Sequence, residues 1–418
     1  GALRAGQYDE QMKQSARYSI EESYRQVRDA AEMGDVYAAW QMGEAVEWED
    51  LVDYMPQTES AREQCLFWYE RAADGGIIPA MVKMGKCCQN GTYREKDEKE
   101  ALRWANQCAA SGEVWGLFQM GEHYRQEEDW EAAFQYDYAA AKQGSSRAML
   151  YLGQMYLNGQ GDIQAAVQAL EGAAARNEAE SFEELGNLFY QDELVERDDE
   201  KAFYWYGKAY AAGIKEAALP LARLYLRPSD EQDTVRAEKL LREAAGIETD
   251  GQASLALGNI YRDGLNGEID MKQAVSWYEK GASQGNPECM EILGCLYFQG
   301  EEGVDRDYAK AFEWLNRCEE AGSLQSASKL GYLYMKGEGC TADENKAKEL
   351  FERAAQTECD GYALYELGFI YERKNESPED LERAAQCYQK AIEMGNESAS
   401  RRFSHFKKGL FGRWKITY

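Results

Sequence analysis

Three stretches of this chain closely resemble one another: ALGNIYRDG at residues 256–264, ILGCLYFQG at 292–300 and KLGYLYMKG at 329–337. Each contains a Leu-Gly pair with Tyr three residues after the glycine, and each precedes an acidic loop and a second apolar segment. Self-similarity at a fixed spacing is typical of repeat proteins. We therefore use the glycine of the Leu-Gly pair as a reference position and count offsets from it.

The reference position recurs ten times, at spacings of 32 to 42 residues. It is occupied by Gly43, Gly85, Gly121, Gly153, Gly186, Ala222, Gly258, Gly294, Gly331 and Gly368. A small residue at offset −5, Leu or Met at −1 and usually Tyr at +3 share one face of an α-helix, so each copy predicts a helix. Glycine inside a helix costs about 1 kcal/mol relative to alanine. Its recurrence predicts the close approach of a neighbouring backbone.

A second predicted helix follows the first and has its own pattern. Alanine recurs in it nine times with aspartate four residues earlier, at Asp97, Asp129, Asp162, Asp198, Asp233, Asp270, Asp307, Asp343 and Asp380. An aspartate at the start of a helix accepts hydrogen bonds from unpaired N–H groups and suits the positive end of the helix dipole. We therefore interpret these aspartates as N-caps and not as metal ligands.

These repeats resemble the Sel-one-like repeat family, relatives of the tetratricopeptide repeats. The resemblance rests on the Leu-Gly-x-x-Tyr helix, the acid-capped loop and a second helix such as Lys272…Trp277-Tyr278. It implies an all-α solenoid, a right-handed α–α superhelix of about ten helix-turn-helix repeats whose concave face is lined by the first helices. We expect an N-terminal capping half-repeat at 1–34, ten repeats at 35–395, and a capping helix with a basic aromatic tail at 396–418.

The resemblance also implies a function. Members of the family are mostly adaptors that hold proteins or peptides, often in bacteria, so we expect an interaction scaffold and not an enzyme. A regulatory repeat module of a larger signalling or enzymatic protein is the alternative. The formal net charge of −28 favours a basic protein or peptide partner and disfavours nucleic acid.

Composition also bears on location. No apolar run of 18 residues occurs, so no transmembrane segment is predicted. The ten cysteines are scattered without paired or metal-ligand spacing, which favours a reducing compartment and a cytoplasmic location. Export after removal of a signal is the alternative. Some bacterial members of the family have a disulfide between cysteines eight residues apart in each repeat, but here Cys318 is matched by Ser326 and Cys108 by Gly116.

By the resemblance, offsets −3, +1 and +4 of the first helices line the concave face. A polar middle zone consists of Gln154, Asn187, Tyr190, Arg223, Asn259 and Arg262. Carboxamides can bind the backbone of an extended peptide, and arginine can pair with a carboxylate. An apolar C-terminal zone consists of Phe298, Tyr332, Met335, Tyr365 and Phe369, and exposed clusters of this kind favour partner contact. The alternative is that these side chains pack against the next repeat.

Catalytic patterns are nearly absent from the sequence. Ser326 and Lys329 spell Ser-x-x-Lys, as in serine β-lactamases, but Ser326 occupies the small −5 position and neither Lys-Thr-Gly nor Ser-Asp-Asn follows. A β-lactamase-like hydrolase is therefore a remote alternative. His123 and His405 lie near no acid–nucleophile pattern, and we expect no cofactor and no metal.

The chain ends in a basic segment, RRFSHFKKGLFGRWKITY at 401–418, which has six Lys or Arg and no acid. The repeat register predicts that Glu397 to Lys408 form a last helix that covers the final repeat. Residues 409–418 extend past this cap. We predict that Phe411, Arg413 and Trp414 contact an acidic surface, either of this chain or of another copy, which would allow self-association through the tail.

Overall fold

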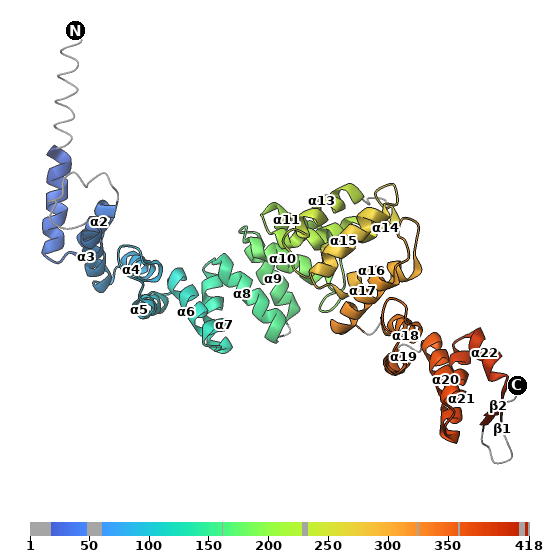
Figure 1. The fold of residues 1–418 in the computed structure, drawn as a ribbon. Coiled ribbons are helices and arrows are strands. Elements are labelled where there is room, and N and C mark those ends of the chain that lie inside the picture. Colours follow the sequence, from blue (N-terminus) through green and yellow to red (C-terminus); the bar gives the residue numbers. More distant parts are fainter. Residues whose placement is uncertain are drawn as a thin grey trace, which may run out of the picture. The chain divides into compact units, whose positions relative to one another are not determined.

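The computed structural model describes residues 18–47, 61–160, 162–227, 233–323, 326–357, 360–408 and 414–416. The chain divides into two compact units, residues 1–209 and 210–418. Helices follow one another along both units, and the strands are short (Figure 1). The prediction of an all-α repeat fold is confirmed.

The first unit begins with helical residues 18–32, which precede five helix pairs. The helices of the pairs are α2 (Val36–Glu47), α3 (Ala61–Asp74), α4 (Ile78–Asn90), α5 (Glu98–Ala110), α6 (Val114–Gln126), α7 (Trp130–Lys142), α8 (Ser146–Met155), α9 (Ile163–Ala174), α10 (Ala179–Tyr190) and α11 (Asp199–Ala211). A π-helical segment, η2 (Tyr156–Gln160), extends α8.

The second unit contains five more pairs. Its elements are η3 (Lys215–Ala217), α12 (Ala218–Tyr225), α13 (Thr234–Ala244), α14 (Gln252–Asp263), α15 (Met271–Ser283), α16 (Pro287–Gln299), α17 (Tyr308–Glu320), α18 (Ala327–Lys336), α19 (Glu344–Thr357), α20 (Gly361–Lys374), α21 (Pro378–Glu393), α22 (Glu397–Phe403), β1 (Phe406–Lys408) and β2 (Trp414–Ile416).

Most reference glycines lie against a large side chain of the second helix in the same pair. A Cβ added to Gly186 would lie 2.6 Å from the ring of Tyr206, which is buried. The same arrangement joins Gly43 to Tyr69, Gly153 to Leu170, Gly258 to Tyr278, Gly294 to Leu315, Gly331 to Phe351 and Gly368 to Tyr388. The predicted close approach therefore occurs, but the prediction of a neighbouring backbone is wrong. A ring or branched side chain fills the space that a Cβ would take.

The predicted N-cap is confirmed at eight of the nine aspartates. Asp270 shows how it works: its side chain accepts hydrogen bonds from the backbone N–H of Lys272 and Gln273 at 3.1 and 3.0 Å. The backbone N–H of Asp270 also donates to the carbonyl of Tyr261 in the first helix, at 2.9 Å. One residue thus starts the second helix and ties it to the first.

Asp380 is the exception. Ser377 is the N-cap of α21, and Asp380 stands three residues later, where it accepts from the N–H of Ser377 at 3.1 Å. The two residues form a capping box, in which each side chain binds the other's backbone. The prediction was wrong here because the loop before α21 holds a serine that takes the cap position.

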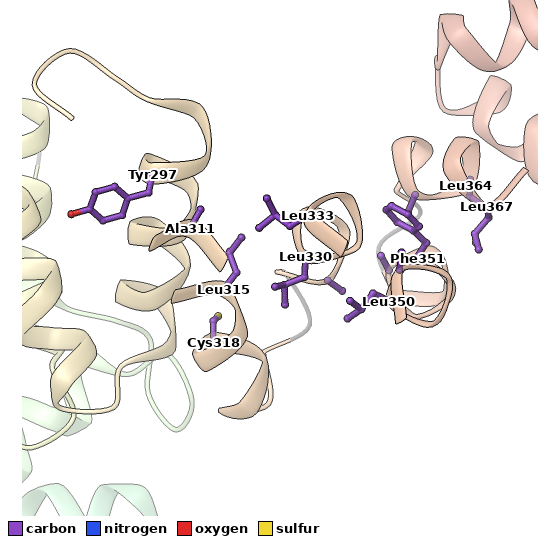
Figure 2. Packing of buried hydrophobic residues seen from close by; sticks show 14 of the residues in the cluster. Tyr297, Ala311, Leu315, Cys318, Leu330, Leu333, Leu350, Phe351, Leu364 and Leu367 are labelled. Atoms are coloured by element: carbon purple, nitrogen blue, oxygen red, sulfur yellow. The ribbon is translucent and has the colours of Figure 1, made fainter. Parts of the chain in front are cut away.

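The cores of neighbouring pairs join into larger sets of buried residues. In the second unit, one continuous set of buried residues extends from Leu255 to Phe406. Figure 2 shows part of it, with Leu315 and Cys318 of α17, Leu330 and Leu333 of α18 and Phe351 of α19 in sequence. Apolar contact between consecutive helices is therefore what holds neighbouring pairs together.

The tail departs from the predicted helix. α22 ends at Phe403, and β1 pairs with β2 in an antiparallel hairpin that matches Lys408 to Trp414. The ring of Trp414 lies 5.4 Å from that of Phe403, and Phe406 lies 5.5 Å from Tyr388 of α21. Among the described residues a hairpin, and not a longer helix, thus covers these rings. Phe411 and Arg413 lie outside the described residues.

We expect Gly186→Ala to lower the free energy of unfolding by about 1–3 kcal/mol, because its methyl group would overlap the Tyr206 ring. Gly207→Ala in α11 is the matched control, since nothing lies within 4 Å of a Cβ there. It should raise stability by about 0.5–1 kcal/mol through the better helix propensity of alanine. Urea unfolding followed by circular dichroism measures both, and equal effects would contradict the packing role of Gly186.

Candidate functional site

The polar candidates of the first unit lie beside Tyr206 and Glu184. The Tyr206 hydroxyl donates to Asn187 Oδ1 at 2.7 Å, and the Tyr190 ring stands edge-on to Tyr206 at 5.9 Å. Gln154 Nε2 donates to Glu184 Oε1 of the next first helix at 2.7 Å. Asn187 and Tyr190 therefore lie together beside Tyr206, whereas Gln154 links two consecutive repeats through its hydrogen bond.

The polar candidates of the second unit show the same arrangement. The Tyr278 hydroxyl donates to Asn259 Oδ1 at 2.8 Å. Arg223 Nη2 donates to Gln252 Oε1 at 2.7 Å, and Arg262 forms an ion pair with Asp263 at 2.8 Å. Some of the polar groups that were expected to bind a ligand are thus already hydrogen-bonded or ion-paired within the chain.

Each of the two asparagines has one side-chain group that is not used within the described residues. In each, the carboxamide oxygen accepts from a buried tyrosine, so the Nδ2 donors of Asn187 and Asn259 point the other way along the amide. Among the described residues these donors have no hydrogen-bond partner. The tyrosines fix the orientation in which a peptide carbonyl could be bound.

The apolar candidates separate into two groups. Phe298 and Tyr332 are neighbours, with ring centroids 5.3 Å apart. Tyr365 lies 6.0 Å from Tyr388, and the Arg402 guanidinium lies 4.6 Å above the Phe369 ring, so this group adjoins the tail. Met335 packs against the core. Trp414, the one described tail candidate, also packs against that core.

Two cavities, one in each unit, occupy the same place in the repeat. The first has a volume of about 1020 Å³ and is lined by Arg125, Trp130, Tyr151 and Gln154, among others. The second has a volume of about 520 Å³, and its equivalent residues are Phe298, Tyr308, Lys329 and Tyr332. Both use offset +4 of one repeat, the residue after the capping aspartate, and offsets −2 and +1 of the next repeat. Offsets +1 and +4 were predicted from the sequence. Offset −2 and the residue after the capping aspartate were not.

A buried ion pair lies beside the first cavity. Asp137 is fully buried, occupies the position that holds Tyr206 or Tyr278 in other pairs, and binds Arg125. The Arg125 guanidinium lies 3.8 Å above the Tyr151 ring. Burial raises the pKa of Asp137 to about 6, against the lowering effect of Arg125. The positive charge of Arg125 at this cavity is therefore balanced by the buried carboxylate of Asp137.

Comparisons with known proteins agree with this architecture. The family model described as Sel1 repeat matches residues 36–77, 78–113, 146–171, 183–214, 251–286, 287–323, 324–356 and 361–396. The chain belongs to the Sel1 repeat family. The pairs α6–α7 and α12–α13 fall outside the matched Sel1 stretches.

Several relatives and one solved structure are similar to this Sel1 repeat chain. An uncharacterised protein of Neisseria meningitidis serogroup B is 26% identical over 77% of this chain and 73% of its own length. The chitin synthase regulator SKT5 of Saccharomyces cerevisiae is 29% identical over 68% of this chain, and the ligase component HRD3B of Arabidopsis thaliana is 28% identical over 53%. The chain spans 42% of SKT5 and 37% of HRD3B.

One structural neighbour is a protective antigen present in uropathogenic Escherichia coli strains, whose crystal structure displays the same repeat fold. Its TM-score to this chain is 0.71 at 26% identity, and the match covers 91% of this chain and 81% of the antigen. The Sel1 repeat architecture is therefore shared over nearly the whole length.

The Ser-x-x-Lys pattern falls at a buried turn of a Sel1 repeat. Ser326 is 0% exposed and contacts Cys318, whose thiol also donates to the carbonyl of Pro287 at 3.3 Å. A substrate from solvent cannot reach the Ser326 hydroxyl. Within the described ranges, no cluster of three His, Cys, Asp or Glu could hold a metal, and no helix there is long and apolar enough to cross a bilayer.

We expect the stability that Asp137 contributes to fall as the pH rises. Its folded-state pKa near 6 lies above the ordinary value of 3.8, so the contribution is complete below pH 4 and is lost as the pH rises through 6. Relative to Asp137→Asn, the free energy of unfolding of the natural chain should decline by about 1 kcal/mol between pH 5 and pH 7.5. Urea titrations at several pH values test this. A rise with pH would mean that the Arg125 ion pair outweighs burial.

We expect Ser326→Cys to form a disulfide with Cys318 under mild oxidation, because the two buried side chains are neighbours between α17 and α18. Mass spectrometry should find the loss of two hydrogen atoms, which the oxidant removes, and of two free thiols. Ser328→Cys, which places a thiol two residues away in the second cavity, is the control and should keep its thiol. Equal oxidation of both variants would contradict the observed contact.

Proposed function

We propose that this Sel1 repeat chain is a scaffold that binds a protein or peptide along its first helices. The observation that carries the proposal is the pair of equivalent cavities, since each opens beside a +1 and a +4 side chain. Concave, partly apolar pockets with a few polar groups are typical binding sites. Sel1 repeats typically mediate protein–protein interaction, and the names of HRD3B and SKT5, a ligase component and a regulator, support the same role.

In this proposal the ligand is an extended segment. Within each unit, the Nδ2 group of Asn187 or of Asn259 donates to a backbone carbonyl of such a segment, and the cavity of that unit takes one of its side chains. Main-chain hydrogen bonds then supply affinity and the cavities supply specificity. The overall charge of −28 speeds the approach of a basic partner and makes the association sensitive to salt.

The domain boundaries are also part of the proposal. We infer that α6–α7 and α12–α13 are divergent repeats, which gives ten repeats at 35–395 between a half-repeat at 1–34 and the cap and tail at 396–418. The chain spans under half of HRD3B and SKT5, so a regulatory module of a longer protein is the second candidate. Self-association through the tail remains a proposal.

The experiment is affinity capture from a lysate at low and high salt, followed by a binding measurement with the captured protein. Asn187→Asp and Asn259→Asp keep the acceptor for Tyr206 and Tyr278 but remove the Nδ2 donor. Each should weaken binding about threefold to tenfold, the value of one hydrogen bond. Asn106→Asp, on the exposed side of α5, adds the same charge and should leave affinity unchanged. Equal effects at all three positions would reject the proposed contact.

A further inference from the structure

The smaller cavity, in the second unit, has an unusual combination of walls. Phe298 of α16, Tyr308 of α17 and Tyr332 of α18 form an aromatic corner, in which Phe298 stands edge-on to Tyr308 at 5.7 Å and to Tyr332 at 5.3 Å. Tyr362 of α20 closes another side and is 38% exposed. Four helices from three consecutive pairs therefore build one recess of about 520 Å³.

Two cations line this recess. Arg306 is held in place by neutral groups: its Nε donates to the carbonyl of Gln299 at 3.1 Å, and its Nη1 to the Tyr308 hydroxyl at 3.5 Å. Lys329 reaches the Cys295 thiol, whose pKa burial raises, so the thiol is neutral at pH 7. In the described part of the chain neither cation has a carboxylate within ion-pair distance.

Acids are absent from the lining, although the chain has 75 Asp and Glu against 47 Lys and Arg. The eight described lining residues are Phe298, Gln299, Arg306, Tyr308, Ser328, Lys329, Tyr332 and Tyr362. The nearby acids Glu338 and Glu366 interact with the hydroxyls of Tyr332 and Tyr362 and do not line the recess. The lining of this recess therefore differs in charge from the chain as a whole.

We propose that this recess binds the carboxylate of an Asp or Glu side chain in a partner peptide, with an adjacent apolar side chain against the aromatic corner. The assignment rests on the proposed scaffold function and gives the ligand chemistry of one of its two cavities. Cationic donors bind carboxylates in strong hydrogen bonds, and partial burial strengthens them. A basic side chain in this recess would meet two like charges.

The equivalent cavity of the first unit gives the contrast. Its cation, Arg125, is already paired with the buried Asp137, and Glu131 is among its lining residues. The lining at the same place in the repeat frame therefore has a balanced charge in one unit and two cations without an acid in the other. Only the second-unit cavity should select for a carboxylate.

The test uses two tripeptides with blocked ends, acetyl-Phe-Glu-Phe-amide and acetyl-Phe-Gln-Phe-amide, which differ only in the carboxylate. Binding to the full chain is measured by isothermal titration calorimetry at low salt. The Glu peptide should bind at least tenfold more tightly. Arg306→Gln with Lys329→Met should reduce that preference to within twofold, while Lys407→Met, which removes an exposed cation of the hairpin, should preserve it. Circular dichroism confirms that each variant is folded.

Equal binding of the two peptides, or a preference that survives in the double variant, would overturn the carboxylate assignment and leave the recess as a site for apolar side chains. If neither peptide binds while the captured partner still depends on Asn187 and Asn259, the assignment also fails and the scaffold function stands. Inorganic phosphate is the competitor for the alternative anion. Stronger displacement of the Glu peptide by phosphate than by acetate would equally overturn it.

Discussion

The contact between the reference glycine and a large side chain of the second helix sets the geometry of each helix pair. With no Cβ at Gly186 or Gly258, the rings of Tyr206 and Tyr278 lie directly against the first helix. That position lets each hydroxyl donate to the asparagine that directly follows the glycine, Asn187 or Asn259. A packing contact inside the pair therefore also orients a donor group at its surface. The ring contact and the orientation of the asparagine both depend on glycine at this position, despite its conformational cost in a helix.

The capping aspartate imposes the second constraint. Because its backbone binds the first helix and its side chain starts the second, the residue that follows it has a fixed place at the mouth of a cavity. Trp130 and Tyr308 occupy that place in the two units. The geometry of the helix pair is thus constant, and only the side chains at a few offsets vary. Repeats with one fold can therefore present either the Arg125–Asp137 ion pair or two cations without a paired carboxylate.

Much of this could be predicted from the sequence, and the failures have physical reasons. The spacing of the glycines predicted the pairs, and the aspartates predicted eight caps, because both are local features of helix geometry. Periodicity shows which face of a helix is buried but not which atom fills the gap, so the ring opposite Gly186 was mistaken for backbone. For the same reason the sequence did not reveal that Lys329 and Tyr308, from neighbouring repeats, line one recess. The hairpin at Trp414 was not predicted because the seven residues of α22 continue the helical register before the chain turns.

The glycine contact is altered in both pairs that the family model does not match, and also at Gly85 in a matched pair, where Trp115 of the next pair lies against the glycine. Asp137 replaces the apolar partner of Gly121, and Ala222 replaces the glycine itself. Neither change breaks the helix pair, because α6–α7 keeps its cap at Asp129 and α12–α13 keeps its cap at Asp233. The cap and the inter-helix bond of its backbone N–H thus preserve the pair when the packing contact changes. In α7 the changed contact accommodates a buried carboxylate that holds Arg125 at the edge of a cavity.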